Sequence, residues 1–256
     1  DFGLFFFDLG HGAEALRLGR ELAAAASRDV TVVMGAITAP PAPFVPEQYH
    51  FQPGFAVLVA GFGNGDEHTR IAARVRESLP PLFDFVEPMP YLELQQLLDE
   101  ANAWGMRCYE KALYLDELTD DAIATFTQRA SSNCGPLSHA LIIPFDGAYQ
   151  DVDDHETAWG GSRSGYGIFI IGLATTPELL DAERSWVRSL WGALMPYANG
   201  IGAYVNTLAQ FEDDRVRASY GTVKYERLAQ TKAVYDPENI FHRNANIKPA
   251  SPSASR

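Results

Sequence analysis

Residues 30–38 read Val-Thr-Val-Val-Met-Gly-Ala-Ile-Thr, and residues 55–62 read Phe-Ala-Val-Leu-Val-Ala-Gly-Phe. Both runs have the length and the β-branched or aromatic content that is typical of strands. The residues between them include Ala39-Pro-Pro-Ala-Pro-Phe-Val-Pro46, where proline fixes φ and disfavours helix before it. Two successive strands without a helix between them argue against a fully alternating, all-parallel sheet.

The rest of the chain adds further strands and several helical patterns. Additional runs of strand length lie at Leu4–Asp8, Cys108–Leu115, His139–Phe145 and Tyr166–Leu173. Helical spacing or composition is found at Ala13–Ala26, Asp66–Ser78, Tyr91–Ala103, Leu118–Ala130 and Pro177–Leu194. We therefore predict an α+β fold: a mostly antiparallel sheet of six or seven strands, with helices packed on one face. The other face needs a cover, which a partner domain or a cofactor would supply.

Composition and charge exclude several classes of protein. The chain of 256 residues has 20 basic and 33 acidic residues, a formal charge of −13, so we expect no nucleic-acid partner. No apolar run approaches the ~18 residues of a membrane span, so we expect no membrane partner. The chain opens at Asp1 with an apolar strand and without Met or a signal pattern. We expect this chain to be the continuation of a longer protein. A secretion signal at the start of that protein cannot be observed here, and we favour a cytoplasmic location.

Three smaller features each have a structural interpretation. Gly61-Phe-Gly-Asn-Gly65 between a strand and a helix suggests dinucleotide binding, but Asp66 stands where the third glycine belongs. We therefore expect an ordinary turn with Asp66 as N-cap. The acidic residues 151–156 do not have the spacing of a calcium loop, so we expect no metal. Cys108 and Cys134 lack a C-x-x-C spacing and are expected to be buried or half-buried thiols.

The strand Tyr109-Glu-Lys-Ala-Leu-Tyr114 carries polar side chains on both faces. Alternation places Tyr109 and Lys111 on one face, and Glu110 and Tyr114 on the other. Either one face is solvated, or it lines a cavity that holds polar groups. The sequence leaves both alternatives open.

The C-terminal segment contains a series of linked motifs. They read Tyr204-Val-Asn206, Tyr220-Gly221, Arg227-Leu-Ala-Gln-Thr-Lys232, Asp236-Pro-Glu-Asn-Ile-Phe241 and Asn244-Ala-Asn-Ile247. In this order they resemble the C-terminal motif of the berberine-bridge-enzyme-like FAD-linked oxidases, within the vanillyl-alcohol-oxidase or PCMH-type superfamily. Upstream, Gly147 and residues 157–163 resemble the family's glycine turn and aromatic-to-Arg segment. The polar side chains of Tyr204, Asn206, Asn244 and Asn246 stand among apolar residues and need hydrogen-bond partners. The edge of a flavin ring offers such partners.

The resemblance implies a function and a site. It implies the substrate-side half of an FAD-dependent oxidase that oxidises an alcohol, sugar or amine carbon by hydride transfer to flavin N5. Its partners would be a small-molecule substrate, molecular oxygen and an N-terminal FAD domain that is absent from this chain. Without that domain, this chain would be inactive. Tyr204 is the expected catalytic base or orienting group. The expected flavin contacts are Tyr204, Asn206, Asn244 and Asn246, and the expected substrate contacts are Tyr109, Lys111, Tyr166 and Phe169.

One departure and two alternatives accompany that resemblance. Some plant members carry a carboxylate on the strand aligned with residues 166–172, and here that strand has none. The alternatives are a non-catalytic scaffold that keeps the fold without flavin, and a nucleotide-binding enzyme that uses Gly61–Gly65. We expect a substrate domain at residues 1–200, a berberine-bridge-like segment at 201–249 and a disordered tail at 250–256.

Overall fold

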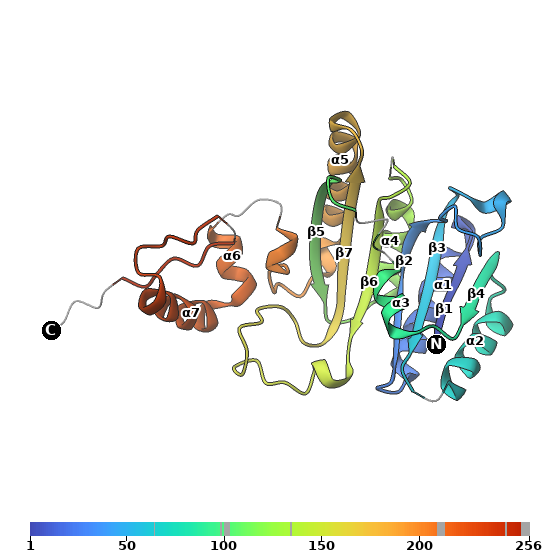
Figure 1. The fold of residues 1–256 in the computed structure, drawn as a ribbon, viewed down its shortest axis with the longest axis horizontal. Coiled ribbons are helices and arrows are strands. Elements are labelled where there is room, and N and C mark those ends of the chain that lie inside the picture. Colours follow the sequence, from blue (N-terminus) through green and yellow to red (C-terminus); the bar gives the residue numbers. More distant parts are fainter. Residues whose placement is uncertain are drawn as a thin grey trace.

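The computed structural model describes residues 1–63, 65–97, 99, 103–133, 135–208, 213–243 and 245–251. Its centre is a seven-stranded sheet in the order β4-β1-β3-β2-β6-β7-β5, in which every neighbouring pair is antiparallel (Figure 1). The strands are β1 Phe2–Phe7, β2 Val30–Thr38, β3 Pro53–Gly61, β4 Phe83–Glu87, β5 Arg107–Leu115, β6 His139–Phe145 and β7 Gly165–Ala174. The predicted α+β fold with a mostly antiparallel sheet is confirmed.

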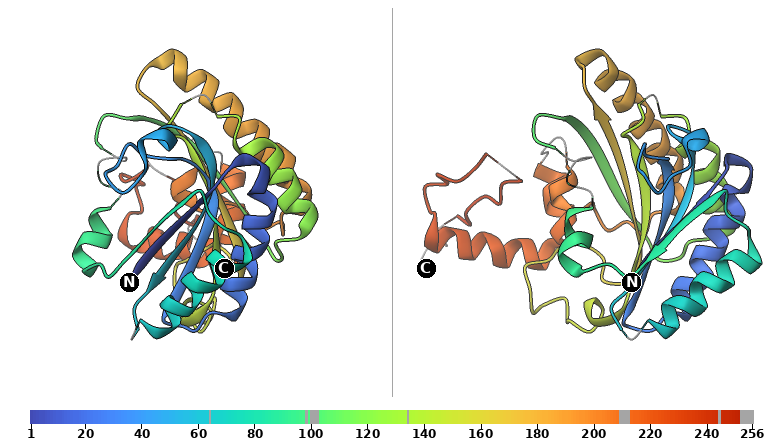
Figure 2. Two further views of the ribbon diagram at one scale, coloured as in Figure 1. Left: turned by 90° about the vertical axis from the view of Figure 1, so that its right-hand side faces the viewer. Right: turned by 45° about the vertical axis from the view of Figure 1, so that its right-hand side comes forward.

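Four of the helices cover one face of the sheet (Figure 2). They are α1 Gly12–Ala25, α2 Asp66–Ser78, α4 Asp120–Ala130 and α5 Pro177–Leu194. The other helices are α3 Tyr91–Gln96, α6 Asp213–Tyr220 and α7 Thr222–Tyr235, with short 3-10 turns at Leu9–His11, Glu47–Tyr49, Gly147–Tyr149, Met195–Tyr197 and Val205–Thr207. Side-chain caps fix two helix starts: Thr119 accepts from the Ala122 amide, and Thr176 from that of Leu179. None of the described helices is long and apolar enough to cross a membrane.

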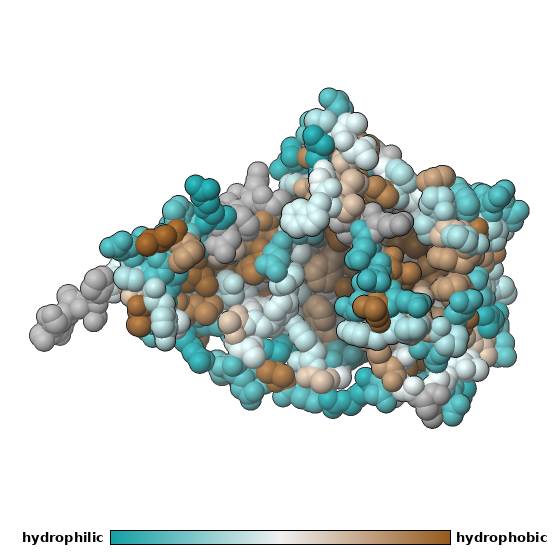
Figure 3. All heavy atoms as spheres, in the orientation of Figure 1, coloured by the Kyte–Doolittle hydropathy of each residue, from teal (hydrophilic) through white to brown (hydrophobic). Residues whose placement is uncertain are grey.

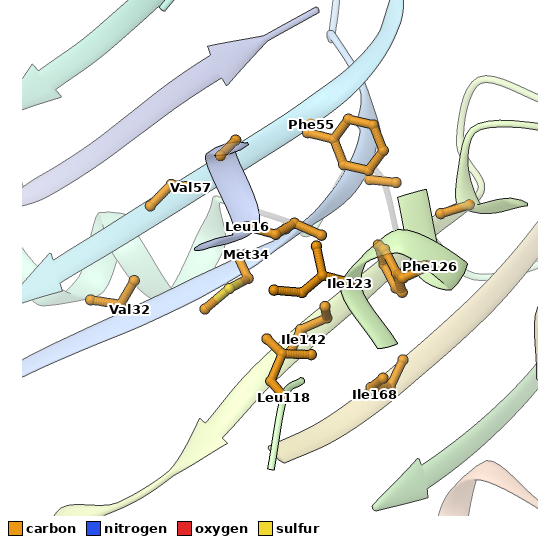
Figure 4. Packing of buried hydrophobic residues seen from close by; sticks show 14 of the residues in the cluster. Leu16, Val32, Met34, Phe55, Val57, Leu118, Ile123, Phe126, Ile142 and Ile168 are labelled. Carbon is orange, nitrogen blue, oxygen red and sulfur yellow. The ribbon is translucent and has the colours of Figure 1, made fainter. Parts of the chain in front are cut away.

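The main hydrophobic core lies between the sheet and these four helices. Side chains of the central strands, such as Met34, Ile142 and Ile168, are fully buried there against Ile123 and Phe126 of α4 (Figure 4). Every second strand residue points to the helices, as the period of a strand requires. This layer therefore fixes which strand residues remain for the opposite face.

The opposite face is covered unevenly. Over β1, β3 and β4 it holds a second core, in which Phe2, Phe6 and Phe83 pack with residues of the 39–49 loop and with Leu94 of α3. Over β6, β7 and β5 several corresponding side chains are only half-buried, among them Leu141, Phe169 and Ile171, whereas Ala112, Tyr114 and Leu173 are buried. Figure 3 shows hydrophobic residues in the hollowed central part of this face. The chain thus supplies its own cover for one half of the face and leaves the other half partly open.

Several local predictions need correction. β4 was not predicted, because it has only five residues and includes the charged Asp84 and Glu87; its pairing with β1 stabilises it. The helix predicted over 91–103 ends at Gln96. The N-cap of α2 is Gly65, at φ 82°, and not Asp66. Cys108, on the edge strand β5, is exposed, and Cys134 lies outside the described residues.

The C-terminal segment forms a small core of its own. Ala203, Leu208, Val216, Tyr225 and Ala229 are buried together, and Ile247 packs on them. Helix α7 belongs to this core, because its buried residues face α6 and the chain end. Phe241, the last residue of the Asp-Pro motif, is 78% exposed and lies outside this core. Residues 252–256, within the predicted tail, lie outside the described part.

Candidate functional site

The half-covered face of β6, β7 and β5 is the candidate site. On β5, the face turned away from α5 carries Glu110, Ala112 and Tyr114, because Tyr109 and Leu113 lie in the helix-side core. The strand register sets Glu110 opposite Ile171 and Ala112 opposite Phe169 of β7. Ile171 and Phe169 are half-buried, whereas their helix-side neighbours are fully buried. The surface is therefore apolar, with polar groups at its ends.

Three of the predicted substrate contacts lie on the other side of the sheet. The Tyr109 hydroxyl accepts a hydrogen bond from Arg188 Nε at 3.0 Å, and Lys111 Nζ lies 4.3 Å from the centre of the Trp191 ring. Tyr166 packs against the helix-side core. Of the four predicted residues, the structure leaves only Phe169 on the half-covered face. The polar residues on the two faces of β5 thus have different surroundings: one set contacts α5, and the other borders the open surface.

A chain of aromatic rings borders this surface. It runs from Tyr114 to Phe145 (centroids 5.8 Å apart), then to Tyr149 (5.2 Å), Trp159 (5.9 Å) and Tyr204 (4.9 Å). Tyr149 and Trp159 belong to the loop between β6 and β7, which reaches towards the C-terminal segment (Figure 1). The rings therefore connect the end of β5 with the predicted catalytic tyrosine.

Tyr204 is held by its own sequence neighbours. Asn206 Nδ2 donates to the Tyr204 hydroxyl oxygen at 2.6 Å, and Thr207 Oγ1 donates to the Tyr204 carbonyl at 2.7 Å. The 3-10 turn Val205–Thr207, which brings these groups together, lies against β5. Asn206 was expected to contact the flavin, and in the structure its amide supports the Tyr204 hydroxyl. Because the phenol oxygen accepts from Asn206, its own proton can be donated elsewhere.

The two remaining predicted asparagines are less well defined. Asn244 lies outside the described residues. Asn246 Oδ1 is buried and has no hydrogen-bond partner among the described residues, while its neighbours Ala245 and Ile247 pack on the C-terminal core. The convergence of all four C-terminal side chains on one surface stays a prediction.

Lys224 is a structural residue of the site that has no role in the C-terminal motifs. Its side chain is 7% exposed; Nζ contacts Asp154 Oδ1 at 2.6 Å and donates to the carbonyl oxygen of Trp159. Arg227 adds a bond of 2.8 Å to the carbonyl of His155. The acidic loop is thereby attached to α7. A lysine in an otherwise apolar helix face is the signal that could have identified this contact.

Burial keeps two tyrosines beside the site, Tyr114 and Tyr149, protonated. Desolvation raises the pKa of Tyr114 far above its ordinary value, and that of Tyr149 to about 12. The Tyr114 hydroxyl is buried and has no partner among the described residues. A Cβ at Gly161 would lie 2.5 Å from that oxygen, so glycine is required where the loop passes it. A buried hydroxyl without a partner is costly, because it has lost its hydrogen bonds to water.

Comparison with known proteins supports the resemblance seen in the sequence. Residues 203–248 match the family model "Berberine and berberine like". An FAD-linked oxidoreductase of Dictyostelium discoideum is 25% identical over 198 residues, which are 77% of this chain and 43% of that protein. Tetrahydroberberine oxidase of Berberis wilsoniae is 23% identical over 176 residues, 62% of this chain and 33% of that enzyme. The resemblance to the berberine-bridge-enzyme-like FAD-linked oxidoreductases is thus confirmed.

Solved structures show the same fold. The crystal structure of 6-hydroxy-D-nicotine oxidase from Arthrobacter nicotinovorans superposes with a TM-score of 0.76 at 19% identity, over 98% of this chain and 54% of that one. This chain therefore spans about half the length of the proteins it matches.

Proposed function

We propose that this chain is the substrate-side half of an FAD-dependent oxidoreductase, with the half-covered face of β6, β7 and β5 closing over a flavin held mainly by a second domain. The observation that carries the proposal is the apolar, partly open surface at Phe169 and Ile171 beside the unpaired Tyr114 hydroxyl. Such a surface is stable only when something apolar covers it. The match of residues 203–248 to the family model supports a flavin as that cover.

The residues present fit a flavin. A flat aromatic ring would pack on Phe169 and Ile171, and its polar edge would offer an acceptor to the Tyr114 hydroxyl. FAD, when bound, supplies the electron acceptor for hydride transfer from the substrate carbon at its N5 position. The residues of the chain then exclude water, orient the substrate and handle its proton.

Tyr204 is the group we assign to orient the substrate or to exchange its proton. Asn206 fixes the phenol through its oxygen, and the Trp159 ring limits its rotation at a centroid distance of 4.9 Å. A group pre-oriented in this way loses little entropy when substrate binds. The substrate would be an alcohol, a sugar or an amine, and molecular oxygen would be the final electron acceptor.

The test is expression of the complete reading frame that contains this chain. We expect a yellow protein with flavin absorption bands that consumes oxygen with a suitable substrate. Tyr204→Phe should retain its flavin and lose turnover ~10²-fold or more, the usual contribution of a proton-transferring group. Tyr235→Phe, which removes an 84% exposed phenol, is the matched control and should behave as wild type. A colourless complete protein would overturn the proposal and favour a non-catalytic scaffold.

A further inference from the structure

The geometry points to Glu110 as a second catalytic residue of this face, the group that accepts the proton of the substrate's hydroxyl or amine. This inference rests on the proposed function and adds to it a carboxylate from β5, whereas β7 supplies none. From the sequence alone, Glu110 was expected only to lie on one face of this strand.

The position of Glu110 follows from the strand register. Its neighbours Tyr109 and Lys111 contact Arg188 and the Trp191 ring of α5, so Glu110 points to the opposite face. There it lies opposite Ile171 of β7. Strand geometry sets Glu110 ~13 Å from Tyr114 along β5. Glu110 therefore lies at one end of the half-covered surface, and Tyr114, the first ring of the aromatic chain, lies at the other.

The carboxylate of Glu110 is half-buried without a counter-charge. Within the part of the chain that the structure describes, no cation or hydrogen-bond donor pairs with it, and its pKa is raised by desolvation alone. By contrast, two other shielded carboxylates have a cation beside them: Asp84 pairs with Arg76 at 2.7 Å and Asp236 with Lys232 at 2.9 Å. An unpaired carboxylate among apolar side chains destabilises the fold and is typical of a functional group.

The other titratable groups on this side do not neutralise Glu110. On its own strand, Cys108 has a pKa raised to about 11 by desolvation and by the charge of Glu110, so the thiol stays neutral. On β6, His139 faces the same side beyond Ile171, and burial lowers its pKa, so it too is neutral near pH 7. Glu110 is thus the acidic group of this surface whose pKa is raised, and a raised pKa suits a carboxylate that acts as a general base.

The proposed step balances as follows. The substrate's O–H or N–H bond breaks and its proton passes to the Glu110 carboxylate. The neighbouring C–H bond would break at the same time, and bound flavin would supply the oxidant that takes up the hydride with both of its electrons. A C=O or C=N bond forms in the product. Glu110 later releases the proton to water.

The experiment compares Glu110→Gln with wild type in the complete flavoprotein, and Glu117→Gln, an exposed residue just after β5, is the matched control. Three readouts are measured between pH 4 and 9: the flavin absorption spectrum, the unfolding midpoint, and anaerobic flavin reduction by benzyl alcohol, D-glucose and benzylamine. Where none of the three compounds reduces the flavin, the first two readouts decide.

We expect a pH-dependent spectral change in wild type and in the control, and its absence in Glu110→Gln. Because the folded-state pKa of Glu110 is raised, ionisation opposes folding, so stability is lost as pH rises through that value. Glu110→Gln should therefore unfold at a higher temperature than wild type at pH 8 and at the same temperature at pH 4. Reduction by an active probe should slow ~10²-fold or more.

Unchanged spectra, unfolding midpoints and reduction rates in Glu110→Gln would overturn the role of Glu110 while leaving a yellow, reducible protein and the proposed function intact. A complete protein without flavin would instead overturn the proposed function, and the unfolding comparison would still report whether Glu110 is an unpaired buried acid.

Discussion

The attachment of the acidic loop to α7 through Lys224 leads to a quantitative prediction. Lys224→Met keeps the apolar stem and removes the ammonium group. The bond to the Trp159 carbonyl is lost, and a hydrogen bond to a charged donor is worth ~1.5–3 kcal/mol. The bond to Asp154 adds less, because that carboxylate is 60% exposed and an exposed ion pair contributes ~0–1 kcal/mol. We expect a loss of about 2 kcal/mol in the free energy of unfolding.

Urea denaturation followed by circular dichroism measures that loss, and limited proteolysis of residues 146–164 reports whether the loop has been released. Asp154→Asn removes only the exposed partner and should cost less than ~1 kcal/mol. In the complete flavoprotein, Lys224→Met should also weaken the contact between Trp159 and Tyr204 and so lower turnover. If Lys224→Met unfolds like wild type, or if Asp154→Asn is equally destabilising, the carbonyl bond does not hold the loop as argued.

Two further predictions concern the sheet. Gly35→Ala should lower the melting temperature by several degrees, because the new Cβ would overlap the carbonyl oxygen of Ala140 on β6. Overpacking of this kind costs ~1–3 kcal/mol. A melting curve identical to wild type would contradict the close approach of β2 and β6. His68 is 3% exposed and burial lowers its pKa, so the folded state binds its proton less readily than the unfolded state. Stability should therefore fall as pH drops below ~6.5, and His68→Gln should reduce the difference between melting temperatures at pH 5 and pH 8; an unchanged difference would contradict this.

Most of the architecture could be predicted from the sequence, since it depends on local patterns. Strands such as Val30–Thr38 show β-branched runs, and the helix α5 begins at a Thr-Pro pair that caps it. The short strand β4 could not be predicted in this way. Asp84 of β4 forms an ion pair with Arg76 of α2, and the backbone of β4 pairs with β1. Neither partner is adjacent to β4 in the sequence.

The site was harder to predict because the sequence does not say which face of β5 is covered. Tyr109 and Lys111 were expected at the substrate, yet their partners Arg188 and Trp191 on α5 lie some eighty residues further along the chain. Tyr204 and Asn206 were predicted through the resemblance of the C-terminal motifs, and their direct hydrogen bond is a local consequence of that sequence.

The loop contacts of the site depend on distant pairs in the same way. Lys224 lies 65 residues beyond the carbonyl that it holds. No local periodicity signals such a pair; only a charged residue in a buried helix position hints at it.

The position of the flavin in the complete protein is the most direct test of the proposed site. A crystal structure of the FAD-bound protein should place the isoalloxazine ring against Phe169 and Ile171, with Glu110 towards one end of the surface and Tyr114 towards the other. A ring bound against the helix layer of α1, α4 and α5, or beyond the C-terminal core and out of reach of Tyr204, would contradict it.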